Sequence, residues 1–206
     1  MRHQVQSLQA QLAQYRDEGG LPNYRELFER SADANLIIDG DTFVDCNEAT
    51  VKMHRYDTRE ELLQSHPSEL SPEYQPDGRL SYEKANDMMA IAFAQGSHRF
   101  EWMHQRADGE VFPVEVLLTS VPDGDRVVLH VVWREITERM AVALEAYQRA
   151  HPLRQGMSRE ELRSRLQERL PGLGGRLFNQ VIALAVHQGA VAQNETSVWT
   201  GGHVVR

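Results

Sequence analysis

The sequence predicts a mixed α+β protein in which a five-stranded antiparallel sheet carries helices on one face and a smaller helical unit follows. Two short apolar strands joined by an Asp-Gly-Asp turn come first, and several helix-start signals follow them. Three longer strands joined by two further Asp-Gly turns then complete the first unit. This order of elements is typical of an antiparallel sheet with its helices packed on one side.

Composition indicates a globular chain with a buried core. The 206 residues suit one ordinary domain or two small ones. Hydrophobic residues make up 41% and charged residues 25%, which is near the average for folded proteins. No segment approaches the roughly 18 consecutive apolar residues of a membrane span, and the first residues lack the layout of a secretory signal. We therefore expect a cytoplasmic protein without a membrane partner. The single Cys46 excludes an intrachain disulfide and fits a reducing compartment.

Charge divides the chain into two parts. Residues 1–147 hold 14 Lys and Arg against 26 Asp and Glu, a net charge of −12. Residues 148–206 hold 8 Arg against 4 Glu, a net charge of +4. An acidic part does not attract nucleic acid, whereas a basic one can, so the two parts are expected to have different partners. The alternative is that each part simply has a solvated surface.

The first 20 residues favour a helix with a short heptad-like seam. Val5, Leu8, Leu12 and Tyr15 follow one another at spacings of three and four, and glycines and a proline end the pattern. A helix this short is marginal alone, so pairing with a second copy as a coiled coil predicts a homodimer. A frayed end helix or the tail of a longer coil fits the pattern equally well.

Local signals place the elements up to residue 65. The pattern predicts a brief helix near 24–28 and a hairpin over 36–44. Asn47 is a suitable N-cap for the next helix. Thr58 and Glu61 form a capping box that begins another.

A proline-rich stretch at 66–80 predicts a loop, after which Ser81 is expected to cap a longer helix that ends at Gly96. Three strands follow, and a final helix runs to about Arg149. The strands are predicted at His98–Gln105, Val111–Val121 and Arg126–Trp133.

Motifs across segment 24–140 occur in the order that is typical of one family. They lie at 36–39, 45–49, 58–63, 106–110, 113–116 and 134–139. Together they resemble a PAS sensor domain, which we place at 21–140. The resemblance implies a cavity for an unidentified small molecule, and an exit helix at 138–150 that connects the domain to its output and contacts a protein partner.

The resemblance assigns signal coupling to the end of the last strand. Arg134, Glu135 and Thr137 lie where the family has an Asp-Ile-Thr ending, with Glu in place of Asp. Glu135 and Thr137 are expected to cap the exit helix while a nearby arginine pairs with Glu135, so that a shift of the sheet can move the helix. An ordinary cap with a surface ion pair is the alternative.

No motif for catalysis, a cofactor or a metal is present, so we expect no enzyme activity and no tightly bound cofactor. His98 and His104 share a strand face and His130 lies on the neighbouring strand, but the intervening aromatic residues favour packing over metal binding. Cys46 lies outside the helix that carries the reactive cysteine of related flavin photosensors. The long helix lacks the histidine that related haem proteins use.

The last part, 151–206, reads as helix, turn, helix and hairpin, which is typical of a winged helix. Ser158 and Glu161 form a capping box, and apolar residues recur at helical spacing in both helices. The stretch 151–163 resembles a winged-helix repeat of the bacterial selenocysteine-specific elongation factor SelB. That family binds RNA, so Arg159, Arg163 and Arg176 become candidates for nucleic-acid contact, with a protein-docking surface as the alternative. The phosphate loop of a GTPase is missing.

The sequence thus favours a non-catalytic sensory module coupled through an exit helix to a winged-helix interaction domain. Two other hypotheses stay open. One is an RNA- or ribosome-associated module related to selenocysteine incorporation. The other is the sensor fragment of a histidine kinase or cyclic-dinucleotide enzyme whose catalytic domain lies elsewhere.

Overall fold

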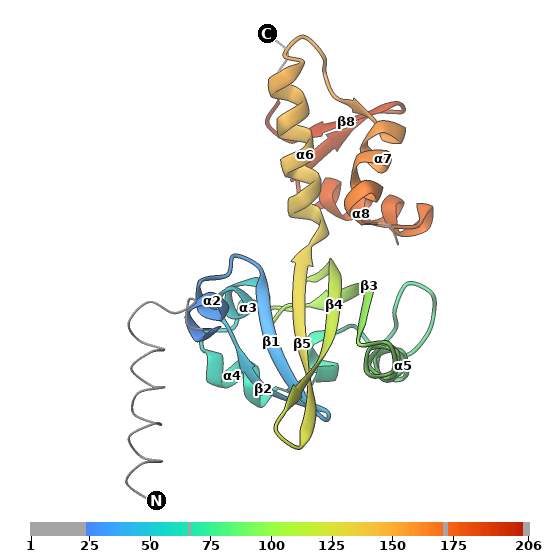
Figure 1. Cartoon of the computed structure of the whole chain (residues 1–206). Coiled ribbons are helices and arrows are strands. Elements are labelled where there is room, and N and C mark those ends of the chain that lie inside the picture. Colours follow the sequence, from blue (N-terminus) through green and yellow to red (C-terminus); the bar gives the residue numbers. More distant parts are fainter. Residues whose placement is uncertain (1–23, 66, 171–172, 204–206) are drawn as a thin grey trace, which may run out of the picture.

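The computed structural model describes residues 24–65, 67–170 and 173–203, so the proposed coiled-coil segment 1–20 lies outside the described part. A five-stranded antiparallel sheet forms the centre of the first unit, in the order β2-β1-β5-β4-β3. Figure 1 shows this sheet in blue, yellow and green. Its strands are β1 (Ala34–Asp39), β2 (Thr42–Cys46), β3 (Ser97–Gln105), β4 (Val111–Asp123) and β5 (Arg126–Glu135). This confirms the predicted fold class.

Helices and a buried apolar cluster cover one face of the sheet. Residues with even numbers on β3 and β4, such as Trp102 and Val116, point into this cluster. Val51 and Leu62 bring their helices onto the same cluster. The helical elements on this face are α3 (Glu48–His54), α4 (Arg59–Gln64), the 3₁₀ turn η1 (Pro67–Leu70) and α5 (Ser81–Gln95). Helix α2 (Tyr24–Arg30) instead places the Phe28 ring 6.4 Å from that of His130, on the other face.

The caps predicted for α3 and α4 are confirmed. The Asn47 side chain accepts a hydrogen bond from the backbone N–H of Thr50 at 3.1 Å, and its amide donates to the carbonyl of Phe28 at 3.0 Å. Thr58 accepts from the N–H of Glu61 at 3.2 Å. Each bond satisfies a donor that the first turn of a helix leaves unpaired.

The cap predicted for α5 is wrong. Leu80 occupies the N-cap position without a side-chain bond, and Ser81 is the first helical residue. The Ser81 hydroxyl instead donates to the carbonyl of Pro72 at 2.5 Å and accepts from the Gln75 side chain at 2.9 Å. Bonds to the preceding loop therefore take the place of the local cap.

The second unit is a helix-turn-helix with a small three-stranded sheet, in the order β6-β8-β7. Its core is apolar and combines all three helices with the hairpin. Ser158 caps its second helix by accepting from the N–H of Glu161 at 3.1 Å, as predicted. The elements are α6 (Ile136–Ala150), β6 (Met157–Ser158), α7 (Arg159–Arg169), α8 (Gly175–His187), β7 (Val191–Gln193) and β8 (Ser197–Thr200).

The connecting helix α6 belongs to the core of the second unit. Strand β5 ends at Glu135 and α6 begins at Ile136, so the chain passes from sheet to helix without a loop (Figure 1). Ile136, Met140 and Leu144 are fully buried in the second core. The exit helix therefore cannot tilt without carrying the winged helix with it.

The helices of the described ranges include none that is long and apolar enough to cross a membrane.

Candidate functional site

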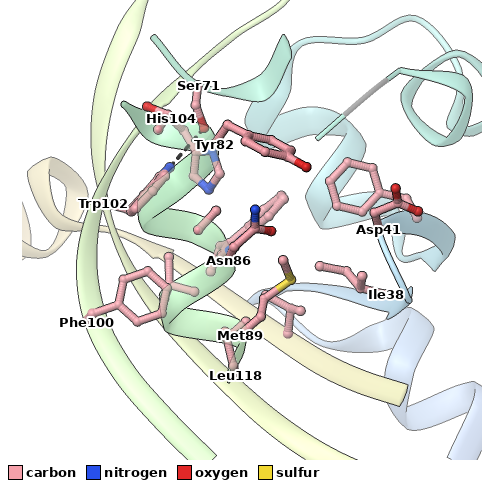
Figure 2. Close-up of a pocket in the computed structure, with 16 residues that line it drawn as sticks. Ile38, Asp41, Ser71, Tyr82, Asn86, Met89, Phe100, Trp102, His104 and Leu118 are labelled. Atoms are coloured by element: carbon pink, nitrogen blue, oxygen red, sulfur yellow. Dashed lines mark hydrogen bonds between the residues drawn. The ribbon is translucent and has the colours of Figure 1, made fainter. Parts of the chain in front are cut away.

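A cavity of about 110 Å³ lies between α5, the β1–β2 hairpin and the inner face of the sheet. Figure 2 shows Trp102, His104 and Phe100 on one side of this space and Ile38 and Asp41 on the other. Most of its wall is apolar or aromatic, from Ile38, Phe43, Ala85, Met89, Phe100, Trp102, Val116, Leu118, Val131 and Trp133.

The mouth of the cavity is polar and its inner end is closed. Asp41, Tyr82 and Asn86 line the cavity and are exposed to solvent. His104 and Trp133 line it as well but are buried. A small molecule can therefore enter beside α5 and meet an apolar interior.

The interior serine is already engaged. The Ser71 hydroxyl accepts a hydrogen bond from the Trp102 indole N–H at 2.9 Å. This bond fixes the indole against the cavity wall, and Figure 2 shows it as a dashed line. The Ser71 hydroxyl therefore already has a hydrogen-bond partner in the cavity wall.

Two buried histidines each keep one ring nitrogen without a hydrogen-bond partner in the described residues, Nε2 of His54 and Nε2 of His104. Nδ1 of His104 lies 2.6 Å from the carbonyl oxygen of Leu70, and Nδ1 of His54 lies 3.3 Å from that of Thr50. A carbonyl oxygen only accepts, so Nδ1 carries the proton in both rings and Nε2 is a bare acceptor. Burial lowers the pKa of His104 to about 4, and burial together with the neighbouring His104 lowers the pKa of His54 well below its ordinary value.

An aromatic cluster joins the cavity to the end of β5. The His54 ring lies 5.1 Å from the His104 ring and 4.8 Å from the Trp133 ring, measured between centroids. The centroid of the Phe112 ring lies 5.4 Å from that of His54. The Arg106 guanidinium packs over the Phe112 ring, 3.8 Å from its centroid. Trp133 belongs to the cavity wall, so the cluster places that wall in contact with Arg106.

Arg106 holds the joint between the two units. Its guanidinium pairs with the Glu135 carboxylate at 2.8 Å, and both side chains are about nine-tenths buried. It also donates to the carbonyl of Met53, which ties the joint to α3. The arginine expected beside Glu135 is thus Arg106, whereas Arg134 pairs with Asp33 at 2.7 Å.

The predicted cap of α6 differs in detail. Glu135 occupies the N-cap position, but its side chain makes no cap hydrogen bond. Its carboxylate accepts instead from the Thr137 hydroxyl and from Arg106. The reason is that a buried guanidinium is a stronger partner for a carboxylate than a backbone N–H at the helix start.

A second contact reaches the winged helix. Glu110, in the β3–β4 turn, pairs with Arg106 at 3.4 Å and with Arg55 at 2.7 Å. Its carboxylate also accepts from the Gln188 side chain, at the end of α8, at 2.8 Å. The start of α6 and the end of α8 therefore both contact carboxylates that pair with Arg106, those of Glu135 and Glu110.

The three histidines considered for a metal lie on two faces. His98 and His104 point to the inner side of β3. His130 lies on the other side of β5, where its Nε2 is 3.1 Å from the Asn35 side chain and its ring is 6.4 Å from that of Phe28. In the part of the chain that the structure describes, no three such ligands gather. Cys46 ends β2 with a buried thiol, whose pKa burial raises to about 11.

The candidate arginines of the winged helix gather around α8. Arg159 donates to the Asn179 side chain at 3.0 Å and to Gln193 of β7. The Arg163 guanidinium lies over Gly175, 3.4 Å from where a β-carbon would stand. Arg176 is the next residue and is exposed. Arg159 and Arg163, which the sequence places four residues apart on one face of a helix, therefore both contact α8.

Sequence reasoning missed His54 and the role of Arg106. Both were visible only as parts of a helix and of a turn, and their partners lie far along the chain. Met53 is 53 residues and Glu135 is 29 residues from Arg106. A local pattern carries no signal of such contacts.

Comparison with protein families decides the identity of the first unit. Residues 32–138, about half of the chain, match the family model described as PAS domain. The chain belongs to the PAS domain family. Residues 142–198 match the model described as elongation factor SelB, winged helix, so the second unit of this PAS protein is similar to that domain. Both matched families are non-catalytic domains.

Solved structures similar to the chain include PAS domains. One belongs to a two-component sensor histidine kinase, with 21% identity, a TM-score of 0.44, and coverage of 63% of this chain and 98% of that one. Another comes from Colwellia psychrerythraea, with 18% identity, a TM-score of 0.48, and coverage of 56% and 95%. An RNA-binding light-oxygen-voltage receptor has 21% identity, a TM-score of 0.46, and coverage of 59% and 36%. The curated proteins gave no significant match.

Proposed function

We propose that the protein is a non-catalytic cytoplasmic signalling module in which the PAS domain perceives a signal and passes it through α6 to the winged helix. The observation that carries this proposal is the shared helix. α6 follows β5 directly, and its Ile136, Met140 and Leu144 are buried in the winged-helix core. A change in the direction of β5 therefore moves the whole second unit.

Arg106 supplies the coupling between the cavity and this helix. It contacts Phe112 of the aromatic cluster on one side and Glu135 on the other. A ligand that displaces Trp133 or His104 changes the packing of this cluster, and the buried ion pair transmits the change to the start of α6. A rigid core favours discrete rearrangements of this kind over gradual deformation.

The experiment compares how far a disturbance in the cavity spreads. Ala85→Leu places extra volume in the cavity wall, and amide NMR spectra then report which residues respond. In the wild-type background, we expect shifts in β5, α6 and α8. In the Glu135→Ala background, where the ion pair with Arg106 is lost, we expect the shifts to stop within the PAS domain.

The control is Glu145→Ala. Glu145 lies on α6 and is exposed, and no ion pair involves it in the described residues. Spread of the disturbance into α8 should persist in this variant. If the amide signals of α8 do not shift when Ala85→Leu is made in the wild-type background, the proposal is contradicted.

A second candidate function is RNA binding by the winged helix. The contacts of Arg159 and Arg163 with α8, the exposed Arg176 on that helix and the net positive charge of residues 148–206 support it. A gel shift with a hairpin RNA across a salt series tests it, and Arg163→Glu should weaken binding and flatten the salt dependence. Arg165→Glu is the control, because Arg165 pairs with Glu161 on the same helix at 2.8 Å. Equal losses in both variants contradict a specific role for the cluster.

A further inference from the structure

A buried carboxylate lies on the outer face of the PAS sheet, the face turned away from the apolar cluster. Glu115 lies between Val114 and Val116 on β4, and both of these side chains belong to the inner core, so the Glu115 side chain points outward. It is nevertheless only 2% exposed. Removing a carboxylate from water is costly unless it is paired, so the groups around Glu115 have to compensate its charge.

Three arginines from three different elements surround this carboxylate. Arg99 of β3 donates to Oε1 of Glu115, and Arg139 of α6 donates to Oε2 at 3.2 Å. Arg134 lies directly opposite Glu115 in the pairing of β4 with β5. Its guanidinium is 3.9 Å from Oε2 and pairs with Asp33 at 2.7 Å. The Glu115 carboxylate therefore joins β3, β4, β5 and α6 at one point.

The position of Arg139 makes this cluster an anchor for the exit helix. α6 begins at Ile136, so Arg139 lies in its first turn, where the helix leaves the sheet (Figure 1). On the inner face, the ion pair between Arg106 and Glu135 holds the same junction. One ion pair therefore holds the start of α6 on each face of the sheet, and two such contacts on opposite sides oppose tilting in either direction.

Strand β4 connects the outer anchor to the wall of the cavity. Val116 lines the cavity, and Glu115 precedes it on the same strand. Adjacent side chains of a strand point to opposite faces of one backbone, so a shift of β4 that moves Val116 also moves the Glu115 carboxylate. This path from the cavity wall to α6 does not pass through Arg106.

We propose that Glu115 is a positioning residue for the exit helix, and that it sets the direction of α6 from the outer face of the sheet through Arg139. This inference rests on the proposed function only in taking the direction of α6 as the carrier of the signal. The direction itself can be measured without any signal.

Arg139→Gln tests the anchor and leaves the buried carboxylate paired with Arg99. Residual dipolar couplings of the full chain report how each unit is aligned. In the wild type, we expect the PAS domain and the winged helix to share one alignment. In Arg139→Gln, the winged helix should lose this shared alignment and align more weakly than the PAS domain, because α6 gains freedom to tilt. Arg139→Lys keeps the positive charge and should restore the shared alignment.

Arg149→Gln is the matched control, because it makes the same chemical change near the other end of α6. Arg149 is exposed, and no ion pair involves it in the described residues. This variant should keep the shared alignment. Combining Glu115→Gln with Arg139→Gln should change the alignment no further than Glu115→Gln alone, because Arg139 acts through that carboxylate. If Glu115→Gln does not fold, the comparison of the three single variants at Arg139 and Arg149 still decides.

Two outcomes overturn the inference. The first is that Arg139→Gln keeps the wild-type alignment of the winged helix. The second is that Arg139→Lys loosens α6 as much as Arg139→Gln does, which would assign the effect to side-chain packing rather than to the ion pair with Glu115. A third outcome bears only on the proposed function. If Arg139→Gln loosens α6 as expected while Ala85→Leu leaves the signals of α8 unshifted in the wild-type background, the anchor stands and the signalling function fails.

Discussion

The two cores of the protein differ in what they bury. The PAS core contains an open cavity and is bordered by buried polar side chains that include His54, His104 and Arg106. The winged-helix core is largely apolar, and among the described residues of that unit only Thr137 and Gln148 are buried polar side chains. A core with a cavity and polar groups can exist in more than one arrangement, whereas a filled apolar core resists change. The PAS core is therefore suited to respond to a signal, and the winged-helix core is suited to move as a rigid body.

A large effect of a single substitution is expected in the second core. Leu144 on α6 is fully buried there, so Leu144→Ala should destabilise the winged helix by about 3 kcal/mol through lost burial and the cavity that remains. Urea unfolding followed by NMR signals of each unit measures this. The exposed Val142 on the same helix is the control, and Val142→Ala should cost about 0.5 kcal/mol or less. Equal loss of both units in Leu144→Ala would show that the two cores unfold as one.

Low pH should destabilise the PAS domain more than the winged helix. The pKa of His104 is about 4 in the folded PAS domain against an ordinary 6.5, so the unfolded chain takes up the proton first and stability falls as the pH drops through this range. Complete passage costs about 3 kcal/mol for this ring, at about 1.4 kcal/mol per pH unit. His54, whose pKa is also lowered, adds to the loss.

Urea unfolding at pH 7, 5.5 and 4 measures the effect on each unit. We expect PAS signals to lose stability, and His104→Phe to remove part of the pH dependence. If low pH destabilises the winged helix as strongly as the PAS domain, the expected difference between the two cores is contradicted.

The smallest expected effect shows where the two units are alike. Thr58 begins α4 in the PAS domain and Ser158 begins α7 in the winged helix, and each hydroxyl accepts from the N–H three residues later. Replacing either residue with Ala should destabilise its own unit by about 1 kcal/mol. Thermal unfolding of the two variants measures this. Unequal losses would mean that tertiary contacts, rather than the local cap, set the energy.

Local chemistry explains what the sequence predicted correctly. Asn47, Thr58 and Ser158 cap helices because their side chains reach an N–H within three residues. Gly109 lies in the turn between β3 and β4, and Gly124 lies in the turn between β4 and β5. Both have a positive φ, a conformation that glycine adopts without strain. Ser81 shows the limit of such signals, since bonds to Pro72 and Gln75 engage its hydroxyl first.

The sequence by itself determined the order of the elements, the PAS and winged-helix resemblances, and the position of the joint near Glu135. The order of the elements depends on periodicity, capping and turn residues, all of which act over a few neighbours, whereas the resemblances and the joint depend on short motifs similar to those of known families. Tertiary structure alone decided that Arg106 is the partner of Glu135, that Nε2 of His104 is buried without a hydrogen-bond partner in the described residues, and that α6 packs into the second core. Each of these is a contact between distant residues, created when strands pair and helices pack, and it leaves no local trace in the chain.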